Sequence, residues 1–309
     1  MHRFEHHAPT TLEEVVKLLT ELGTEAKLLA GGTDLLVFIR HGRIAPKHII
    51  ELSRVGELTR ICELESGLII GACVKLREIE RNSVIRRLYP HISEAASQVG
   101  SVQIRNLATI GGNLCTASPA GDMIPTLMVS GALLHIVGAS GERMVRIEEF
   151  FKGPGETALC ATDVLVSIQL PPPKPRTGWA FFKLGVRGAM DISIVSVAAK
   201  LTLSESTSDI VSEVKVALGS VAPVVMLSHS VEKLLTGKRI TDSLIEEAAH
   251  SVMNEVKPIS DHRASAQYRR LMAAVLTKRA LKTAFHRAVG EQQQLTQLEV
   301  NQGSVFNGG

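Results

Sequence analysis

Hydrophobic and polar positions follow helical and strand patterns in turn over the first 55 residues. The segment TLEEVVKLLTELG carries apolar residues at helical spacing after a threonine cap, and AKLLA is typical of a strand that runs into Gly31 and Gly32. A second short helix and the apolar stretch at 48–50 follow. This alternation predicts a small α/β lobe with parallel strands over residues 1–55.

The pattern changes after residue 55. Residues 58–75 predict a β-hairpin around Glu65-Ser66-Gly67, and residues 84–99 predict a helix that leads to a second glycine pair. A helix and a strand within 123–137, and then the strand VLVSIQLP, complete a second lobe that we expect to span 56–175. Pro125 and several glycines and serines interrupt the uncharged window 123–141, so we predict no transmembrane segment there.

The proline-rich stretch at 171–175 predicts a domain boundary, because consecutive prolines favour a stiff extended chain. Beyond it, ISIVSVAAKLTL and VSEVKVALGSV predict two strands, and helical stripes dominate up to about residue 286. We therefore expect a second domain over 176–286. Residues 287–309 carry no apolar stripe and predict a mobile tail or a partner-binding extension.

Composition narrows the classes of function. The 309 residues suffice for about two domains. The chain has 34 Lys and Arg and 31 Asp and Glu, so its net charge is +3, and it has no long basic run. This weak positive charge argues against nucleic acid as a partner. Four single cysteines and eleven histidines without ligand spacing predict no disulfide framework and no metal site. The first residues lack the apolar core of a secretory signal, which predicts a cytoplasmic protein. Only 4% of residues are aromatic, so a planar ligand must be held mainly by aliphatic side chains and backbone.

Two segments share a pattern that can carry chemistry: LLAGGTDLL at 28–36 and LATIGGNLCTASPAGD at 107–122. In each, an apolar stretch runs into Gly-Gly and then a small polar residue. Adjacent glycines can point successive N–H groups into one concavity and let a phosphate approach the main chain. Thr33, Asp34, Thr109 and Asn113 can add contacts to a sugar or a phosphate. Two such segments predict a phosphate-bearing ligand more strongly than either glycine pair alone.

Asp122 is the only formally charged residue between Arg105 and Glu142. Two compatible roles fit a lone carboxylate in such a stretch: a helix N-cap before MIPTL, or a site residue. The stretch GPGETA at 153–158 loosely matches a dinucleotide-binding motif, but no strand of a βαβ unit precedes it, so we reject a nicotinamide-binding interpretation.

Five motifs, in order, resemble those of one known family. The motifs that carry the resemblance are AGGTDLL, QIRNLATIGGNLCTASPAGD, FFKGPGETAL with VLVSIQLP, FFKLGVRGAMDISIVSVA, and VALGSVAP with ISDHRASAQYRRLMAAVLTKRAL. In these motifs the chain resembles the FAD-binding medium subunit of the molybdenum hydroxylases, the carbon monoxide dehydrogenase and xanthine dehydrogenase type. The resemblance covers about residues 1–286. It implies an α+β fold: a two-lobed FAD-binding domain of the vanillyl-alcohol-oxidase (PCMH) type, then a three-stranded antiparallel sheet with a helix bundle.

The resemblance also implies residue roles, and none of them is catalytic or metal-binding. Lys183 would lie near the isoalloxazine ring, where a cation stabilises the anionic reduced flavin, whereas its other interpretation is an ordinary surface lysine. Asp122 would lie near the ribityl and adenosine side, and Val164 and Leu165 would give aliphatic contacts. The FAD pyrophosphate would lie in a cradle with two halves, formed by Leu29, Ala30, Gly31, Gly32, Thr33, Asp34 and Leu35, and by Thr109, Gly111, Gly112 and Asn113.

The function implied is electron transfer within a heteromeric enzyme. A large subunit would hold molybdopterin, a small subunit would hold [2Fe–2S] clusters, and the FAD of this chain would pass electrons to an acceptor, in a dimer of heterotrimers. The chain departs from some members in having Val99 where they carry a stacking aromatic residue, and in lacking a cysteine-rich insertion, so it should carry FAD only.

Three alternatives stay open. One is a self-contained flavin oxidase of the same fold, and another is a flavin-free docking subunit. The third is a basic binding module, whose cations would come from the C-terminal helices: Arg269, Arg270, Lys278, Arg279, Lys282 and Arg287.

Overall fold

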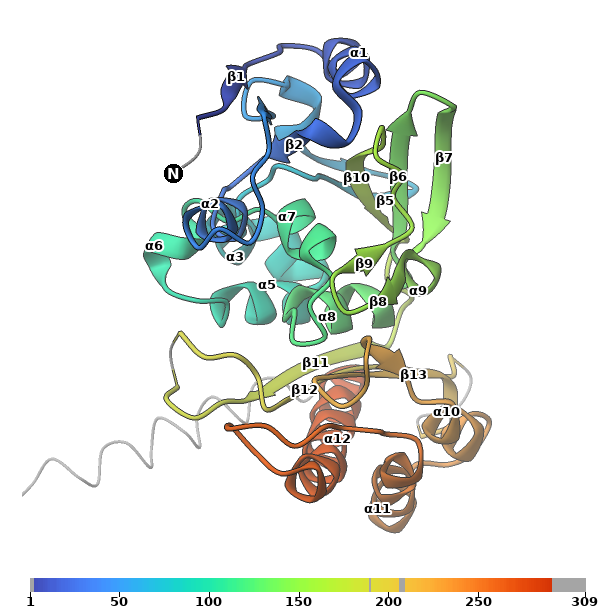
Figure 1. Ribbon diagram of the computed structural model, residues 1–309. Helices are drawn as coiled ribbons and strands as arrows, with labels where there is room; N and C mark the ends of the chain where they lie inside the picture. Colours follow the sequence, from blue (N-terminus) through green and yellow to red (C-terminus); the bar gives the residue numbers. More distant parts are fainter. Residues whose placement is uncertain (1–2, 189, 206–208, 291–309) are drawn as a thin grey trace, which may run out of the picture.

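The computed structural model describes residues 3–188, 190–205 and 209–290 (Figure 1). The chain begins with a small three-stranded sheet in the order β1 (Glu5–His7), β3 (His48–Glu51), β2 (Ala26–Leu29), in which both pairings are parallel. Helix α1 (Leu12–Leu22) follows β1, and α2 (Leu35–Arg40) follows β2. Thr11 and Glu14 form a capping box at the start of α1. The parallel lobe predicted from the sequence is confirmed.

A five-stranded antiparallel sheet forms the second lobe. Its order is β4 (Ile61–Leu64), β5 (Gly67–Gly71), β10 (Val164–Leu170), β6 (Leu133–Gly138), β7 (Gly141–Arg146). The β4–β5 hairpin turns at Glu65 and Ser66, as predicted. Strand β10 lies at the centre and six of its seven residues are buried, which agrees with its nearly continuous apolar sequence.

Helices fill the space between this sheet and the C-terminal domain (Figure 1). They are α3 (Leu76–Arg81), α4 (Ser83–Leu88), α5 (Pro90–Ser97), α6 (Val102–Arg105), α7 (Ile110–Thr116), α8 (Met123–Val129) and α9 (Ile147–Phe150). A small hairpin, β8 (Phe151–Gly153) with β9 (Glu156–Thr157), follows α9. The single helix expected over 84–99 is wrong: Tyr89 leaves the helical conformation before Pro90, so α4 and α5 are separate.

The C-terminal domain is a sheet with helices on one face. The antiparallel order is β11 (Thr177–Leu184), β12 (Val195–Leu203), β13 (Val211–Gly219), β14 (Met226–Leu227). The expected three strands are therefore joined by a short fourth. Helices α10 (His229–Leu235), α11 (Asp242–Ser251) and α12 (Ala266–Val289) follow, and α12 packs across β11 and β12. Helix α12 continues three residues past the expected domain end at 286, and the rest of the predicted tail, 291–309, lies outside the described residues.

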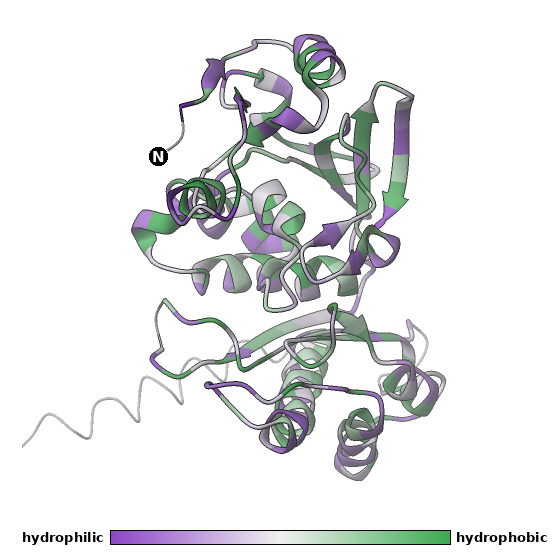
Figure 2. Cartoon of the chain, viewed as in Figure 1, coloured by the Kyte–Doolittle hydropathy of each residue, from purple (hydrophilic) through white to green (hydrophobic). Residues whose placement is uncertain are grey.

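Packing is continuous across the proline stretch between the two domains. Helices α5 and α8 lie against β11, β12 and β13 on the face opposite α12, so β12 is buried along its whole length. Figure 2 shows hydrophobic colour on these facing elements and more hydrophilic colour on the outer helix α11. The His91 imidazole stacks on the Trp179 indole at 4.3 Å between ring centroids, and burial lowers the pKa of His91 to about 3. The C-terminal sheet is therefore one wall of the first domain's core.

Among the described residues, none of the helices combines the length and apolar character needed to cross a bilayer.

Candidate functional site

The first glycine pair forms a turn between strand β2 and helix α2. Gly32 has a φ of +72°, a conformation that favours glycine, and a Cβ on Gly31 would overlap the carbonyl of Leu107. Within the described residues, no acceptor binds the N–H groups of Gly31, Gly32, Thr33 or Asp34. Four consecutive free donors at the start of a helix are the arrangement that binds an anion through the main chain. The role of this segment in binding the FAD pyrophosphate stays a prediction.

The second glycine pair has a different arrangement. The N–H of Gly111 donates to Ala72 O at 2.8 Å, and the N–H of Gly112 donates to the hydroxyl of Thr109, the N-cap of α7, at 3.0 Å. The N–H of Asn113 donates to Thr109 O. These donors are satisfied inside the protein, so this segment offers no free main-chain N–H group from Gly111 to Asn113. The second pair is a capped helix start that packs on Ala72, the residue after β5, and its role in a pyrophosphate cradle stays a prediction.

The two glycines of the second pair also differ from one another. A Cβ on Gly111 would come within 2.6 Å of Ala72 Cβ and 2.7 Å of Ala72 O, whereas a Cβ on Gly112 would meet only the Thr109 hydroxyl within 4 Å. Gly111 is therefore a packing glycine. At Gly112 the added Cβ would lie 2.9 Å from the Thr109 hydroxyl oxygen, and the neighbouring Asn113 has a buried Oδ1 without a partner. An unsatisfied buried amide oxygen needs a donor, which a ligand can supply.

Tertiary structure brings the two segments into contact. The Thr116 hydroxyl at the end of α7 donates to Asp34 Oδ2 at 2.9 Å, and Gly31 lies directly on the main chain of Leu107. Sequence reasoning assigned Asp34 to a ligand and did not identify Thr116 as its partner. No local signal reveals this pair, because 82 residues separate the two side chains.

A buried ion pair joins the two domains at the start of α8. Lys183 Nζ, near the end of β11, lies 2.6 Å from Asp122 Oδ2 and donates to Gln98 O at 3.1 Å. Both side chains are less than 10% exposed. Burial raises the pKa of Asp122 to about 6, and the Lys183 ammonium opposes that rise. The surface interpretation of Lys183 is wrong, and so is the capping role of Asp122, whose side chain makes no N-cap hydrogen bond.

This ion pair is incomplete by itself. Asp122 Oδ1 is buried without a partner, and Lys183 uses two of its three donors within the chain. Sequence reasoning selected both residues from different motifs and did not foresee that they contact each other or that the Gln98 carbonyl binds the ammonium. A buried cation with a free carboxylate oxygen is suited to hold a polar ligand group between the domains.

Val164 and Leu165 lie at the start of β10 with buried side chains. Val164 packs with Val15 and Leu19 of α1, whereas Leu165 belongs to the larger core that includes Ile70 and Leu134. Neither side chain is open to a ligand, so the predicted aliphatic side-chain contacts are not available. Val99, in the place of a stacking aromatic residue, packs against the same larger core.

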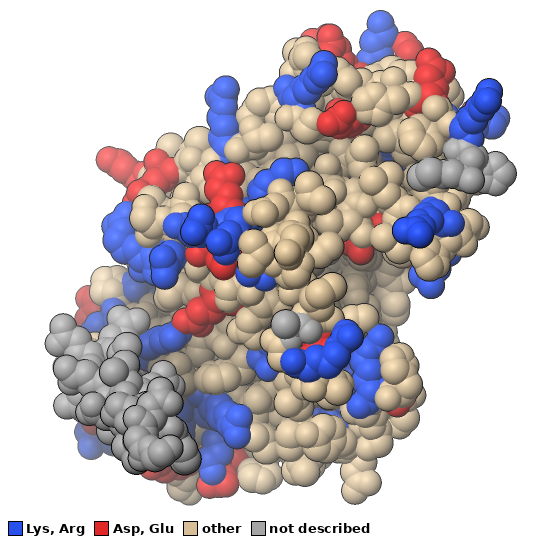
Figure 3. Space-filling view, turned by 90° about the vertical axis from the view of Figure 1, so that its left-hand side faces the viewer, with Lys and Arg blue, Asp and Glu red and all other residues tan. Residues whose placement is uncertain are grey.

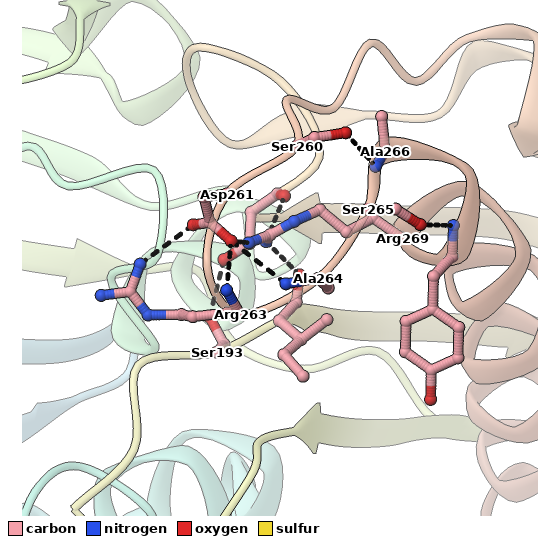
Figure 4. Close-up of polar contacts among 11 residues, drawn as sticks. Ser193, Ser260, Asp261, Arg263, Ala264, Ser265, Ala266 and Arg269 are labelled. Carbon is pink, nitrogen blue, oxygen red and sulfur yellow. Dashed lines mark hydrogen bonds and ion pairs between the residues drawn. The ribbon is translucent and has the colours of Figure 1, made fainter.

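The basic residues of the C-terminal helices are largely paired within the chain. Figure 4 shows Arg269 reaching from α12 to Asp261; the distance is 2.8 Å, and the guanidinium also donates to Ile194 O at 2.6 Å. Although desolvation acts in the opposite direction, hydrogen bonds from Arg263 and Arg269 hold the pKa of Asp261 well below its usual range. Lys278, Lys282 and Arg287 pair with Glu246, Asp242 and Glu94. Arg269 is buried and paired within the chain, so it does not serve as a cation of a basic binding module.

The face drawn in Figure 3 carries Lys and Arg in several separate groups with Asp and Glu among them. Among the described residues on that face, the Lys and Arg side chains do not form the continuous basic band that a nucleic-acid partner would need.

Comparison with known proteins defines the class. Residues 2–173 match the family model "FAD binding domain in molybdopterin dehydrogenase", and residues 180–284 match the "CO dehydrogenase flavoprotein C-terminal domain". Fold and site are thus those of a flavoprotein whose cofactor is FAD.

Similarity extends over nearly the whole chain. It is 33% identical to the xanthine dehydrogenase FAD-binding subunit of Escherichia coli O157:H7, over 93% of this chain and 98% of that subunit. The structure of carbon monoxide dehydrogenase from Hydrogenophaga pseudoflava matches with a TM-score of 0.88 and 34% identity, over 92% of this chain and 98% of the other. Quinoline 2-oxidoreductase from Pseudomonas putida 86 matches with a TM-score of 0.87 and 28% identity, over 93% and 98%.

The chain belongs to the family of FAD-binding medium subunits of the carbon monoxide and xanthine dehydrogenase type, the molybdenum-containing oxidoreductases. The resemblance drawn from the sequence motifs is confirmed, as is the fold class.

The residues present fit FAD on structural grounds. The free N–H groups of Gly31 to Asp34 suit a diphosphate, and the unpaired Asn113 Oδ1 and Asp122 Oδ1 suit hydroxyl or N–H donors of a ribityl chain or a ring. The Lys183 ammonium pairs with Asp122, and so it brings a positive charge next to the segment between Arg105 and Glu142, in which Asp122 is the only formally charged residue.

Proposed function

We propose that the chain is the electron-transfer subunit of a heteromeric molybdenum hydroxylase. It takes electrons from [2Fe–2S] clusters of a small subunit and passes them to an acceptor, while a molybdopterin-binding large subunit oxidises the substrate, in a dimer of heterotrimers. Relatives named as medium chains or FAD-binding subunits support this assignment, since such names describe parts of larger enzymes. Cytoplasmic location stays a prediction, as do the domain bounds 1–175 and 176–286.

One observation carries the proposal: four consecutive main-chain donors, Gly31 to Asp34, have no acceptor among the described residues, and two buried acceptors elsewhere in the site have no donor. The two acceptors, Asn113 Oδ1 and Asp122 Oδ1, are buried, and an unpaired buried polar group destabilises a fold by about 1–3 kcal/mol, so a ligand that donates to them removes this cost. The four N–H groups belong to residues that are half-buried or exposed, and they are open to an acceptor from a ligand. FAD satisfies both kinds of group, because its diphosphate accepts hydrogen bonds and its ribityl hydroxyls donate them.

Each part of the site has a definable task. The first glycine loop binds the diphosphate through N–H groups, and Asn113 orients a polar group beside α7. Lys183 holds a positive charge at the domain boundary, and Asp122 and the Gln98 carbonyl fix its position. When bound, FAD supplies reversible one- and two-electron chemistry, so this chain needs no acid, base or nucleophile of its own.

The first test is the visible absorption spectrum of the purified full-length chain, before and after FAD is added. A flavin spectrum with about one FAD per chain is expected. A chain that stays colourless with excess FAD overturns the assignment and favours a flavin-free docking subunit. A yellow chain that turns over a substrate without partner subunits favours the self-contained oxidase.

A second test addresses electron transfer itself. The flavin should be bleached by substrate only when the chain is co-purified with its large and small subunits, and it should recover its colour when an artificial acceptor is added. Bleaching by substrate without the small subunit would contradict the proposed route.

The charge at Lys183 gives a third readout. Lys183→Met should shift the flavin reduction potential to a more negative value, because a nearby cation stabilises the negative charge of the reduced ring. Lys183→Arg retains a cation at this position, so its flavin reduction potential should stay close to that of the unchanged chain. A Lys183→Met subunit with full flavin content and an unchanged potential would place the ammonium away from the ring.

A further inference from the structure

Three side chains outside the FAD site converge at the edge of the small parallel sheet. His7 Nε2 lies 3.1 Å from His48 Nδ1, and His48 Nδ1 lies 3.5 Å from Glu5 Oε2. All three ligand atoms lie within 4.8 Å of one another. We propose that Glu5, His7 and His48 form a binding site for a transition-metal dication of the Zn²⁺ class.

Sheet register explains why the three side chains meet. In the parallel β1–β3 pair, Glu5 lies opposite His48 and His7 lies opposite Ile50. Glu5 and His7 are two residues apart on one strand, so they share a face of the sheet, and His48 is on the neighbouring strand. His6 alternates to the opposite face, where its Nε2 lies 3.0 Å from Glu51 Oε2. The sequence scan missed the site because 41 residues separate the two ligand histidines.

The spacing matches a tetrahedral metal site. Imidazole nitrogens bind Zn²⁺ at about 2.0–2.1 Å and carboxylate oxygens bind it at about 2.0–2.2 Å, so two ligands at the tetrahedral angle lie about 3.3–3.5 Å apart. The separation of His48 Nδ1 from His7 Nε2, 3.1 Å, is slightly below that range, and its separation from Glu5 Oε2, 3.5 Å, is at the upper end; all three ligand atoms lie within 4.8 Å of one another. A small closing or opening of the side chains would admit the ion without movement of the strands.

The chemistry of the ligands selects the class of metal. Two imidazoles and one carboxylate suit Zn²⁺, Ni²⁺, Cu²⁺ or Co²⁺, whereas Mg²⁺ and Ca²⁺ prefer sites of oxygen alone. Three protein ligands leave a fourth position for water or for a group from a partner subunit. His48 is mostly buried and Glu5 is mostly exposed, with 18% and 67% of their side-chain surfaces accessible, so the ion has a path from solvent.

The expected consequence is that the metal clamps the first strand to the sheet. Strand β1 has only three residues and pairs with β3 alone, so its attachment is weak without further support. A metal that binds the folded state but not the unfolded state raises the stability of the fold in proportion to the logarithm of its concentration. This inference does not depend on FAD or on partner subunits.

The test uses the full chain without a polyhistidine tag, stripped of metal with a chelator. ZnCl₂ is titrated by calorimetry, CoCl₂ is titrated by visible absorption, and the melting temperature is measured with and without ZnCl₂. We expect one Zn²⁺ per chain at this site, an intense Co²⁺ spectrum typical of tetrahedral coordination, and a rise in melting temperature with Zn²⁺.

Four variants locate the site. Glu5→Gln, His7→Gln and His48→Gln should each weaken Zn²⁺ binding by at least about tenfold, since even loss of a residue that only supports a metal ligand costs about 10–100-fold. His6→Gln is the matched control: it removes the neighbouring imidazole of the same strand, which faces away, and it should bind Zn²⁺ as the unchanged chain does. Flavin content should be unchanged in all four.

Two results would overturn the proposal. One is Zn²⁺ binding by Glu5→Gln and His48→Gln that equals that of the unchanged chain, and the other is an equal loss in His6→Gln. Glu5→Gln keeps the test valid if a histidine variant fails to fold, because the Glu5 side chain is exposed and contributes no packing to the core. Circular dichroism of the metal-free variants checks their folding.

Discussion

The two glycine pairs look alike in sequence and differ in structure. At Gly31 and Gly32, the chain turns with a positive φ and leaves four N–H groups without acceptors in the described residues. At Gly111 and Gly112, every N–H from Ile110 to Asn113 donates to a group of the protein itself. The first pair therefore leaves its main-chain donors unpaired within the described chain. The second pair packs a helix start against Ala72, the residue after β5.

The difference shows that glycine has more than one use at a cofactor site. Gly32 is required by its backbone conformation, whereas Gly31 and Gly111 are required because the position of a Cβ is already filled by Leu107 or Ala72. At Gly112 the one heavy atom within 4 Å of an added Cβ is the Thr109 hydroxyl oxygen, at 2.9 Å. A Gly-Gly motif by itself does not tell which of these reasons applies.

The largest effect is expected when the buried charge pair is broken. Lys183→Met removes the partner of the Asp122 carboxylate, and loss of one member of a buried pair destabilises a fold by about 3–5 kcal/mol. Urea unfolding at pH 8 should show a loss of this size. The double variant Lys183→Met with Asp122→Asn should recover much of it, because no unpaired charge is left. Equal stability of the single and double variants would contradict the pairing.

The loss of unfolding free energy in Lys183→Met should depend on pH. The pKa of Asp122 is raised to about 6 from an ordinary 3.8, so the folded state binds a proton at Asp122 more tightly than the unfolded state does. The stabilisation of the folded state that results is present at low pH and is lost as pH rises through about 6. Without Lys183 the folded-state pKa rises further, so the stability deficit of Lys183→Met should shrink between pH 8 and pH 5. Unfolding free energies of both chains across this range give the measurement. A deficit that grows toward low pH would be the wrong sign.

Gly111→Ala is expected to act on stability and hardly on the ligand. The added Cβ would press on Ala72 within the core, and overpacking of this kind costs about 1–3 kcal/mol. The midpoint of urea unfolding should fall, while the folded fraction keeps FAD affinity close to that of the unchanged chain. Gly112→Ala is the matched control, with a smaller loss of stability. FAD affinity that collapses in stable Gly111→Ala protein would restore the cradle role of this glycine.

Gly32→Ala should act mainly on FAD affinity and less on stability, the opposite of Gly111→Ala. A positive φ costs a residue with a Cβ about 1–2 kcal/mol, and relief of that strain would turn the N–H groups away from the ligand. Loss of one hydrogen bond to a charged phosphate weakens binding by about 1.5–3 kcal/mol, which is at least about tenfold in affinity. Fluorescence titration with FAD measures the affinity of the Gly32→Ala chain for FAD. Unchanged affinity would mean that the first loop is not the anion site.

The smallest effect is expected at the contact between the two segments. Thr116→Val removes the hydroxyl that donates to Asp34, and a partly exposed hydrogen bond of this kind contributes about 0.5–1.5 kcal/mol. Thermal unfolding should show a small decrease, and FAD affinity should fall slightly because Asp34 loses its anchor. Thr116→Ser keeps the hydroxyl and should behave as the unchanged chain. A loss in Thr116→Ser as large as in Thr116→Val would assign the effect to packing.

Much of the architecture was predictable because it depends on local pattern. Apolar period and turn residues identified the parallel lobe, the β4–β5 hairpin and the strands on either side of the proline stretch. The break between α4 and α5 was missed, although Pro90 was its signal, because the apolar pattern continues through it. The fourth strand, β14, has only two residues, too few to show a period.

The candidate site was predictable as a set of residues and not as a set of contacts. Lys183 and Asp122 were selected from separate motifs, and their ion pair spans 61 residues of sequence. Val164 and Leu165 were expected to offer side chains to the ligand, yet both point into cores on opposite sides of β10. Burial on both faces of a central strand depends on neighbours that a linear pattern does not show.

The sequence by itself determined the family, the order of the elements and the residues that distinguish the site, because these properties lie in motifs and in periodicity along the chain. Only the tertiary structure decided which N–H groups are free, which glycines pack, and which charges pair. These properties depend on what lies across space from each residue: Leu107 against Gly31, Ala72 against Gly111, and Lys183 against Asp122. The same Gly-Gly pattern therefore leaves the main-chain donors unpaired in one loop and pairs them within the protein in the other.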